Sequence, residues 1–375
     1  MKSFFYALYA FFFNISVRIF PVKKNRVCFL SMHNEGFCDS LGSVCNKLAE
    51  TRRDLEAVFI TREDLSLKNP FRLLSFFLVK SRLLATSAYV FLNDNFMPMG
   101  RLNFRSETVI TQLWHAEGAF KKFGLHISQP ESIRKNEKAG NEKLTYVICS
   151  GEGVRDIYAE AFGVKKEQVL ALGAPRCDYL VSEGNAERAK RELEELYPQC
   201  KGKRIVLYAP TFRNTAEENF ELLRRFDTDK FTRALGDDYA LMVKLHPQIH
   251  ENCNIENAID VTSYDDVRKL ALFCDVLITD YSSICMDFSF LDKKTVFFAY
   301  DLEKYKAERD FYFDYESYVP GRVAFTLDEC IEAVMSELDK EKNERFKKMN
   351  FDFFDSLSSQ RVIDRIIKQQ ECDLK

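Results

Sequence analysis

The densest group of residues that could carry out chemistry is the segment LWHAEGAFKKFG, residues 113–124. His115 follows an apolar, strand-like run, and Gly118, Lys121 and Lys122 come soon after it. Imidazole titrates near neutral pH, so a histidine beside a flexible loop and two cations indicates a general base that deprotonates a hydroxyl near an anionic substrate. For the two lysines, a solvated pair without a function is the alternative interpretation.

Three other segments place polar residues directly after predicted strands. They are YAPTFR (208–213) with Pro210, Thr211 and Arg213, VKLHP (243–247) with His246, and ITDYSSICMDF (278–288) with Asp280, Ser282 and Ser283. In the first segment the proline turns the chain, the threonine can donate a hydrogen bond, and the arginine can bind phosphate through two hydrogen bonds. A solvated loop arginine is the alternative there.

The other two segments also suggest a site for an anion. His246 stands at the end of a strand, where it suits proton transfer or a hydrogen bond to phosphate; a structural histidine that caps the loop is the alternative. Ser282 and Ser283 open a predicted helix whose first N–H groups would favour an anion. An ordinary helix cap made by Ser282 or Asp280 fits the motif as well. The chain has no glycine-rich Walker motif.

A fourth loop, GAPRCDYL at 173–180, has the same order of strand, glycine, proline and charged residues. It leads into the charged stretch that separates the two halves of the chain. Arg176 and Asp178 could take part in a site or could form a purely structural pair, and the two interpretations have equal weight at this point.

Short apolar runs alternate with helical stretches, which is typical of a parallel sheet covered by helices on both faces. The alternation restarts after a charged helical stretch at 182–203. This predicts an α/β chain of two Rossmann-like domains in a GT-B-type architecture, with an interdomain cleft at the carboxyl ends of the strands. The expected divisions are an N-terminal segment at 1–24, domains at 25–185 and 186–355, and a C-terminal helix at 356–375.

Composition excludes several classes of protein. The 375 residues are 46% hydrophobic and 30% charged, which excludes a disordered chain and a bundle of membrane-spanning helices. A net charge of −3 provides no basic field, so no nucleic-acid partner is expected. Eleven scattered cysteines without a CxxC pair are typical of a reducing compartment. No acidic cluster has clear metal-binding spacing, and we expect neither a metal nor another cofactor.

The N-terminus is aromatic and basic. Residues 4–13 read FFYALYAFFF, about half the length of roughly 20 residues that a spanning helix needs. Arg18, Lys23 and Lys24 follow, and the first acid is Glu35. The pattern predicts a helix that lies in the membrane interface and places its cations against anionic lipid. The alternative is a buried N-terminal helix followed by a solvated basic tail.

Taken in order, these motifs resemble those of the CDP-glycerol glycerophosphotransferase family, the teichoic acid and capsule enzymes that transfer glycerol phosphate or ribitol phosphate from a CDP-polyol. The resemblance covers roughly residues 25–335. It includes SGEGVRDIYAEAFGV (150–164) and the run AYDLEKY…RDFYFDY (299–315). It implies two domains, the first binding the acceptor and the second the CDP-polyol, and a membrane-associated N-terminal region.

The resemblance also implies roles for single residues. His115 matches the first family histidine, the expected base, and His246 matches the second, at the donor pyrophosphate. The matches to the donor phosphate and nucleotide pocket are Thr211, Arg213, Asp280, Ser282 and Ser283, with Pro210 in the same loop. Lys121, Lys122, Arg176 and Asp178 lie in matching segments. One departure is that Ala116 and Glu117 separate the histidine from Gly118, where the family often has His-Gly directly.

The expected reaction is attack by an acceptor hydroxyl on the β-phosphorus of a CDP-polyol donor, with release of CMP. The acceptor is expected to be a lipid-linked glycan or polyol phosphate at the cytoplasmic face of the cell membrane, and the product a teichoic acid or capsular polymer. Two alternatives stay open: an inverting glycosyltransferase that uses a nucleotide sugar, and a non-catalytic scaffold on the membrane surface.

Overall fold

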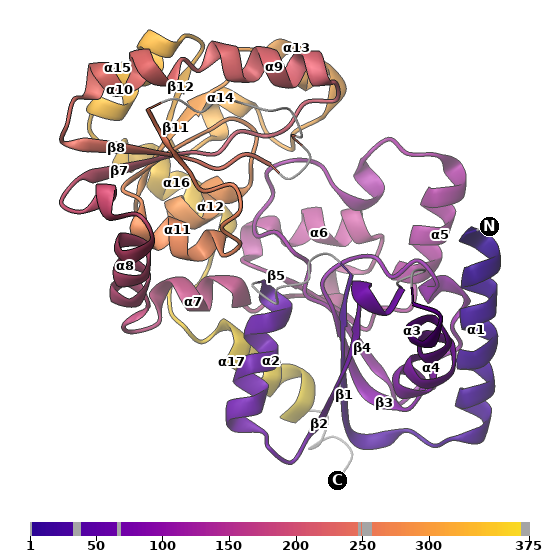
Figure 1. Ribbon diagram of the computed structural model, residues 1–375. Helices are drawn as coiled ribbons and strands as arrows, with labels where there is room; N and C mark the ends of the chain where they lie inside the picture. The colour runs from indigo at the N-terminus through magenta and orange to yellow at the C-terminus, as the bar shows by residue number, and fades with distance from the viewer. Residues whose placement is uncertain (1, 33–38, 66–68, 247–248, 250–256, 369–375) are drawn as a thin grey trace. The chain divides into compact units, whose positions relative to one another are not determined.

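The computed structural model describes residues 2–32, 39–65, 69–246, 249 and 257–368. The chain forms two compact units. Unit 1 comprises Met1–Asp178 and Asn350–Lys375, and unit 2 comprises Tyr179–Met349. Within the described ranges each unit has a six-stranded sheet in which all neighbouring strands are parallel (Figure 1). The predicted α/β fold with parallel sheets is therefore confirmed, whereas the GT-B arrangement and the interdomain cleft stay predictions.

The sheet of unit 1 has the strand order β2-β1-β3-β4-β5-β6. Phe29 of β1 lies in register with Phe59 of β2 and Phe91 of β3, and its ring centroid is 5.7 Å and 5.8 Å from theirs. Part of the abundant phenylalanine thus forms a stacked row across the sheet. The strands are β1 (Lys23–Ser31), β2 (Glu56–Thr61), β3 (Ser87–Leu92), β4 (Val109–Gln112), β5 (Tyr146–Cys149) and β6 (Val169–Ala171). The helices include α1 (Lys2–Ile19), α2 (Ser40–Thr51), α5 (Glu131–Asn141), α6 (Arg155–Phe162) and α17 (Ser358–Ile363).

The sheet of unit 2 has the strand order β12-β11-β10-β7-β8-β9. Its strands are β7 (Arg204–Tyr208), β8 (Tyr239–Val243), β9 (Ile259–Asp260), β10 (Val276–Thr279), β11 (Lys294–Phe298) and β12 (Arg322–Ala324). The longer helices are α8 (Asn185–Leu196), α9 (Ala216–Arg225), α10 (Thr228–Leu235), α15 (Leu327–Met335) and α16 (Lys340–Asn350). The shorter ones are α11 (Val267–Phe273), α12 (Ile284–Phe290), α13 (Leu302–Glu308) and α14 (Tyr315–Tyr318), and α7 (Asp178–Val181) stands at the boundary between the units. A core of buried aliphatic and aromatic residues joins α15 to this sheet.

The end of the described chain packs into unit 1. Val362, Ile363, Ile366 and Ile367, from α17 and the π-helical turn Asp364–Lys368, are fully buried in the same core as β1 and α2. Four buried aliphatic side chains explain why this segment is part of the unit. The compact units divide the chain at 178/179 and 349/350, and the sequence-based domains at 25–185 and 186–355 stay a prediction.

The stretch at 71–87, whose apolar residues have helical spacing, is divided. It contains α3 (Pro70–Ser75), a π-helical segment (Phe76–Lys80) and α4 (Ser81–Ala85), and Ser87 already begins β3. The Thr86 hydroxyl donates to the Arg82 carbonyl at 2.8 Å, and the Ser87 hydroxyl donates to the Leu83 carbonyl at 2.7 Å. These side chains satisfy carbonyls of the last turn, and this local bonding accompanies the end of the helix.

The N-terminal helix α1 has one buried face and one exposed face. Tyr9 and Phe13 are fully buried, and their rings lie 4.5 Å from Phe76 and 4.7 Å from Phe104. On the other face, the ring of Phe11 is 58% exposed. Within the described ranges, no helix has the combination of length and apolar composition that crossing a bilayer requires. The buried face agrees with the interpretation of a packed N-terminal helix, and the membrane-interface interpretation stays a prediction.

The two faces of α1 predict different effects of the same substitution. Phe13→Ala should lower the free energy of unfolding by about 3–5 kcal/mol, because it removes a fully buried ring and leaves a cavity. Phe11→Ala, on the exposed face, should change it by no more than about 0.5 kcal/mol. Urea unfolding followed by circular dichroism measures both variants, and equal losses would contradict the packing of this helix.

Candidate active site

Polar residues from neighbouring strands gather at the carboxyl edge of the sheet in unit 2. Strands β11, β10, β7 and β8 are adjacent and parallel, so the residues that follow them lie along one edge. Asp301 follows β11, Asp280 follows β10, Thr211 and Arg213 follow β7, and His246 follows β8. The fold thus places along one edge four predicted site residues from three segments that are far apart in the sequence.

Arg213 is the centre of a buried ion-pair network. Its Nη2 atom lies 2.9 Å from Asp280 Oδ2, and its Nε atom donates to Asp301 Oδ2 at 2.7 Å. The Tyr281 hydroxyl donates to Asp301 Oδ1 at 2.8 Å, and the guanidinium also donates to the Thr211 carbonyl at 2.6 Å. Burial alone would lower the pKa of Arg213, but the two carboxylates raise it, so the group stays charged.

Thr211 shows a different environment on the same loop. Its N–H donates to Asp280 Oδ1 at 2.8 Å, which fixes the loop after β7 to the end of β10. Its hydroxyl is buried, and in the described structure no hydrogen-bond partner meets it. A buried hydroxyl without a partner carries an energetic cost unless a ligand satisfies it. Pro210, just before it, is also buried.

The remaining residues of this edge are more accessible. His246 is half-buried, and its ring lies 4.6 Å from the ring of Phe212. Ser282 is half-buried and Ser283 is exposed, and both precede α12, which begins at Ile284. The Ser282 hydroxyl accepts a hydrogen bond from the Ile284 N–H at 3.4 Å, a local contact of the kind that a helix cap makes.

In unit 1, His115 lies just beyond the carboxyl end of β4. Its Nδ1 atom is 3.0 Å from the carbonyl oxygen of Asn93, which follows β3. A carbonyl can only accept, so Nδ1 carries the proton and Nε2 has the lone pair in the neutral ring. The Asn93 amide group in turn accepts from the Met32 N–H at 3.2 Å and donates to Asp39, the N-cap of α2.

The backbone after His115 is held from several sides. The Gly118 N–H donates to the Ser150 hydroxyl at 3.0 Å, and the Tyr158 hydroxyl lies 3.0 Å and 3.1 Å from the carbonyls of Ala116 and Gly118. The side chain of Asn350 accepts from the Ala119 N–H at 3.0 Å. This loop is therefore fixed by residues from three other parts of unit 1. Lys121 and Lys122, a few positions on, are half-buried.

Arg176 and Asp178 make different contacts, both within unit 1. The Nε atom of Arg176 lies 3.9 Å from Oε2 of Glu117, a carboxylate that is only 8% exposed. Asp178 accepts hydrogen bonds from the N–H groups of Ser358 and Ser359 at 2.9 Å and 2.7 Å. It therefore caps α17, and burial raises the pKa of its carboxyl group. These contacts favour the structural interpretation for Asp178.

Sequence reasoning missed three residues of these networks. Asp301 holds Arg213, Asn93 orients His115, and Glu117 faces Arg176. Asp301 follows a recognisable strand, so its place after β11 was a usable signal, whereas nothing in the sequence pairs Asn93 with His115. In the part of the chain that the structure describes, no group of three or more His, Cys, Asp and Glu side chains is placed to hold a metal ion.

The chain matches one family along almost all of its length. A model of the CDP-Glycerol:Poly(glycerophosphate) glycerophosphotransferase family matches residues 11–368. The chain is 34% identical over 365 residues to the teichoic acid poly(ribitol-phosphate) polymerase of Bacillus spizizenii, which covers 94% of this chain and 58% of the polymerase. It is 32% identical over 358 residues to the teichoic acid ribitol-phosphate primase of the same organism, which covers 93% of this chain and 92% of the primase.

Solved structures of a teichoic acid polymerase also resemble this chain. The wall teichoic acid polymerase TagF superposes with a TM-score of 0.77 at 26% identity, over 94% of this chain and 91% of that chain. A histidine variant of TagF that was soaked with CDPG superposes with a TM-score of 0.79 at 25% identity, over 97% and 93% of the two chains. The chain thus spans a little over half of the curated polymerase and nearly all of the curated primase.

The ion-pair network predicts that Arg213 is needed for stability. Arg213→Met would leave Asp280 and Asp301 buried without their cation, so the free energy of unfolding should fall by about 3–5 kcal/mol. The matched control is Arg225→Met, whose side chain is 59% exposed, and its effect should stay within about 1 kcal/mol. Urea unfolding measures both, and equal stability of the two variants would contradict the role of the network.

Proposed function

Because the chain belongs to the CDP-Glycerol:Poly(glycerophosphate) glycerophosphotransferase family, we propose that it transfers a polyol phosphate from a CDP-polyol to an acceptor hydroxyl and releases CMP. The observation that carries this proposal is the match to the family model over residues 11–368, since it includes every predicted site segment. The transferred unit is glycerol phosphate or ribitol phosphate. Relatives with each specificity in their names resemble this chain.

We propose that His115 is the general base. The contact of its Nδ1 atom with the Asn93 carbonyl places the ring proton on Nδ1, so the lone pair on Nε2 would accept the proton of the acceptor hydroxyl. The acceptor oxygen forms a bond to the β-phosphorus as the bond from that phosphorus to the CMP oxygen breaks. The electron pair of the broken bond leaves on CMP, whose phosphate is anionic and needs no proton.

The donor phosphates would lie at the carboxyl edge of the sheet in unit 2. Thr211 has a buried hydroxyl ready to donate, and His246, Ser282 and Ser283 supply accessible donors along the same edge. Arg213 acts as a positioning residue, because its guanidinium is engaged by two carboxylates. It stabilises the loop that carries Thr211, with Pro210 and Asp280 as parts of the same support.

In unit 1 the cations near His115 would serve the acceptor. Lys121 and Lys122 lie on the loop that follows the histidine, and Arg176 faces Glu117 of that loop. We propose that they attract an anionic acceptor, such as a lipid-linked glycan or polyol phosphate. Asp178, the first residue of α7, caps α17 and takes no direct part.

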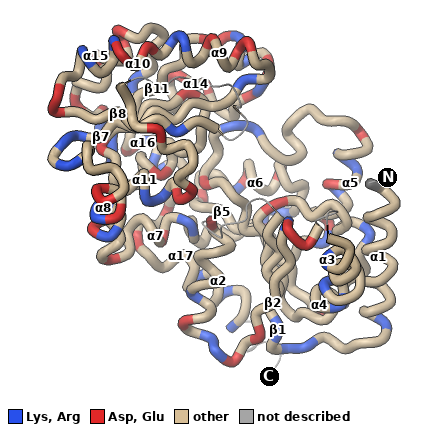
Figure 2. Tube along the Cα trace, viewed as in Figure 1, with Lys and Arg blue, Asp and Glu red and all other residues tan. Residues whose placement is uncertain are grey.

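We further propose that unit 1 binds the cytoplasmic face of the membrane through α1 and α3. Phe4 and Phe11 on α1 and Phe71 on α3 are 68%, 58% and 82% exposed. The chain after α1 is basic, with Lys23 and Lys24 at the start of β1, and Figure 2 shows blue segments at this turn. Exposed aromatic rings beside cations suit the interface of an anionic bilayer.

The base assignment predicts a large loss of turnover in His115→Ala. With CDP-glycerol or CDP-ribitol and a synthetic lipid-linked acceptor, CMP release should fall by about 10²–10⁴-fold, the usual contribution of a general base. The control is His126→Ala, whose imidazole pairs with Glu160 on α6 at 3.5 Å and lies outside the proposed site. UDP-N-acetylglucosamine in the same assay should give no turnover.

Four results of this assay separate the possible functions. Turnover with one CDP-polyol identifies the donor, and resolving the product lengths by mass separates a primase from a polymerase. Wild-type rates in His115→Ala would refute the base assignment, and turnover with the nucleotide sugar alone would refute the proposed function in favour of a glycosyltransferase.

The membrane proposal predicts a loss of binding without a loss of stability. The triple substitution Phe4→Ser, Phe11→Ser and Phe71→Ser should reduce binding to vesicles of phosphatidylglycerol at least tenfold, because it removes exposed rings that would enter the bilayer. Co-sedimentation with vesicles measures this. The control is Phe220→Ser with Leu196→Ser in unit 2, two residues that are 54% and 56% exposed. Unchanged binding by the triple variant would contradict the proposed surface.

A further inference from the structure

Trp114, the residue immediately before the proposed base, has a backbone conformation that bulky residues rarely adopt. Its φ is 58°, in the left-handed region that glycine populates readily. Among the described residues, the other non-glycine positions with positive φ are Asn257 and Asp292, and these two residue types tolerate such a backbone. For a tryptophan the conformation carries an energetic cost, so the surrounding structure has to hold it in place.

Gln112, the last residue of β4, holds this turn with its side chain. The side chain is fully buried, its Oε1 atom accepts from the Trp114 N–H at 2.9 Å, and its Nε2 atom donates to the Asp94 carbonyl at 3.4 Å. Between them, the Leu113 N–H donates to the carbonyl of Leu92, the last residue of β3, at 2.7 Å. The chain therefore leaves β4 along a path that is fixed to the end of β3.

The turn places the indole ring of Trp114 against the imidazole ring of His115. The two ring centroids are 4.0 Å apart, and the ring planes are inclined by 37°. In an extended strand, successive side chains point to opposite faces of the sheet. The contact between these adjacent rings thus depends on the change of direction at Trp114, which connects the strained backbone to the position of the histidine.

Two other aromatic rings fix the indole in turn. The ring of Phe123 stacks on it with a centroid distance of 5.3 Å and an angle of 29°. The ring of Phe162, a fully buried residue of α6, meets it edge-on at 5.3 Å and 89°. Trp114 itself is only 7% exposed. Closely packed rings of this kind leave the indole little room to move, so the imidazole contacts a fixed surface.

We propose that Trp114 is a positioning residue for the base, and that its indole ring sets the direction in which His115 presents Nε2. This rests on the proposed function, in which His115 is the base. The hydrogen bond from Nδ1 to the Asn93 carbonyl leaves the imidazole able to turn about the axis of that bond. Contact with the indole fixes the plane of the imidazole as well, so the two contacts together direct the Nε2 lone pair to one place.

The indole would also favour the protonated form of the histidine. When Nε2 accepts the proton of the acceptor hydroxyl, the imidazole becomes a cation. The face of a tryptophan ring attracts a cation that lies within about 6 Å of its centroid, and the imidazole centroid lies at 4.0 Å. Because this attraction arises only as the proton moves, it would stabilise the transition state more than the ground state.

The first test measures the tautomer of His115 by NMR and needs no substrate. The full chain is labelled with nitrogen-15 in its imidazole rings, and the spectrum of His115→Gln identifies the signals of this residue among the five histidines. The measurement is made at a pH of about 8.5, where an ordinary imidazole is neutral. Trp114→Gly permits the left-handed backbone but removes the ring. In this variant the fraction of His115 with the proton on Nε2 should rise at least threefold over the wild type.

Two further variants examine the ring itself. Trp114→Phe keeps an aromatic ring beside the imidazole, so its tautomer should match the wild type and its kcat should stay within threefold. Phe123→Leu leaves Trp114 in place and removes one of the rings that hold it. The fraction with the proton on Nε2 should then rise at least twofold, a result that remains available if Trp114→Gly does not fold.

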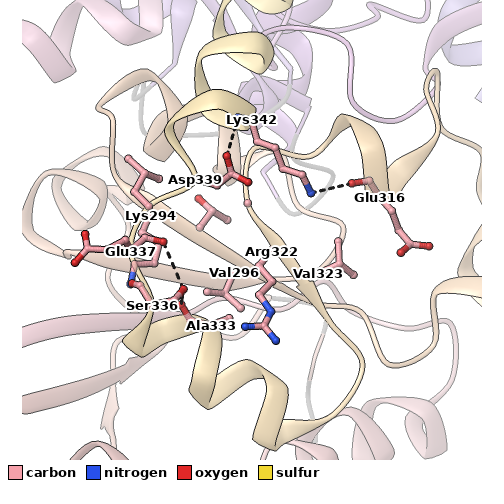
Figure 3. Close-up of a pocket in the computed structure, with 13 residues that line it drawn as sticks. Lys294, Val296, Glu316, Arg322, Val323, Ala333, Ser336, Glu337, Asp339 and Lys342 are labelled. Carbon is pink, nitrogen blue, oxygen red and sulfur yellow. Dashed lines mark hydrogen bonds between the residues drawn. The ribbon is translucent and has the colours of Figure 1, made fainter.

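Two controls separate positioning from a general loss of stability. Phe29→Leu removes a fully buried ring from the stacked row of unit 1, outside the cluster formed by Trp114, Phe123 and Phe162. Val296→Ala removes two buried methyl groups from the wall of a cavity at the amino ends of β11 and β12 in unit 2 (Figure 3). Both controls should keep the wild-type tautomer and kcat.

The second test is a double-mutant cycle in the CDP-polyol assay. Trp114→Gly should lower kcat at least tenfold and change the KM for the CDP-polyol less than threefold. Added to His115→Ala, the same substitution should lower kcat less than twofold further, because Trp114 acts through the histidine. A merely structural role would lower kcat by the same factor in both backgrounds.

Three outcomes would overturn the proposal: a wild-type tautomer in Trp114→Gly, equal losses of kcat in Trp114→Gly and Trp114→Phe, or full additivity in the double-mutant cycle. Failure of the proposed function is a different result. Absence of turnover in the wild type, or wild-type turnover in His115→Ala, would refute that function. The NMR result would still decide whether Trp114 orients the imidazole.

Discussion

A buried guanidinium cannot remain in a protein interior unless opposite charge meets it, and this constraint organises the carboxyl edge of unit 2. Arg213 comes from the loop after β7, and its two carboxylates come from the loops after β10 and β11. The network therefore fixes three loops to one another through a single cation. Tyr281 and Tyr315 extend it, because their hydroxyls donate to the Asp301 side chain and the Asp280 carbonyl.

One consequence concerns which groups of this edge could bind the phosphates of a CDP-polyol. The charge of Arg213 is balanced inside the protein, so the positive charge available to a diphosphate at this edge has to come from other groups. A loop that is held this firmly would present the Thr211 hydroxyl to the proposed donor without reorganising, and Phe212 of that loop contacts the ring of His246 on the loop after β8. In the proposed site, the ion pairs would contribute rigidity and the neutral donors would contact the ligand.

In unit 1, a network of hydrogen bonds through Asn93 holds His115 in place. Asn93 joins the ends of β1 and β3 to the cap of α2 through its side chain and orients His115 through its carbonyl. Asn350, at the point where the chain returns from unit 2, contacts the loop after His115. The carbonyl of Asn93 favours one tautomer of His115 only while it stays in place, and the hydrogen bonds of the Asn93 side chain hold it there.

Much of the fold and of the candidate site could be predicted from the sequence, and the features that could not be predicted have physical causes. The alternation of apolar runs with helical stretches predicted the parallel sheets. The position of polar residues directly after predicted strands placed five of them at sheet edges: His115, Thr211, Arg213, His246 and Asp280. The partners of these residues are tertiary, so a chain read in order could not pair Arg213 with Asp301 or Asp178 with the start of α17. The short strand β12 was also missed, because its three residues show no periodicity.

The same network determines what the carboxyl edge can still offer to a ligand. Its charged side chains neutralise one another over short distances, because Arg213 meets both Asp280 and Asp301. The buried hydroxyls of Tyr208 and Thr211, in contrast, have no hydrogen-bond partner in the described structure. A polar group that the protein has not satisfied is one that a ligand can satisfy, so the unmet demand at this edge is for hydrogen bonds and not for charge.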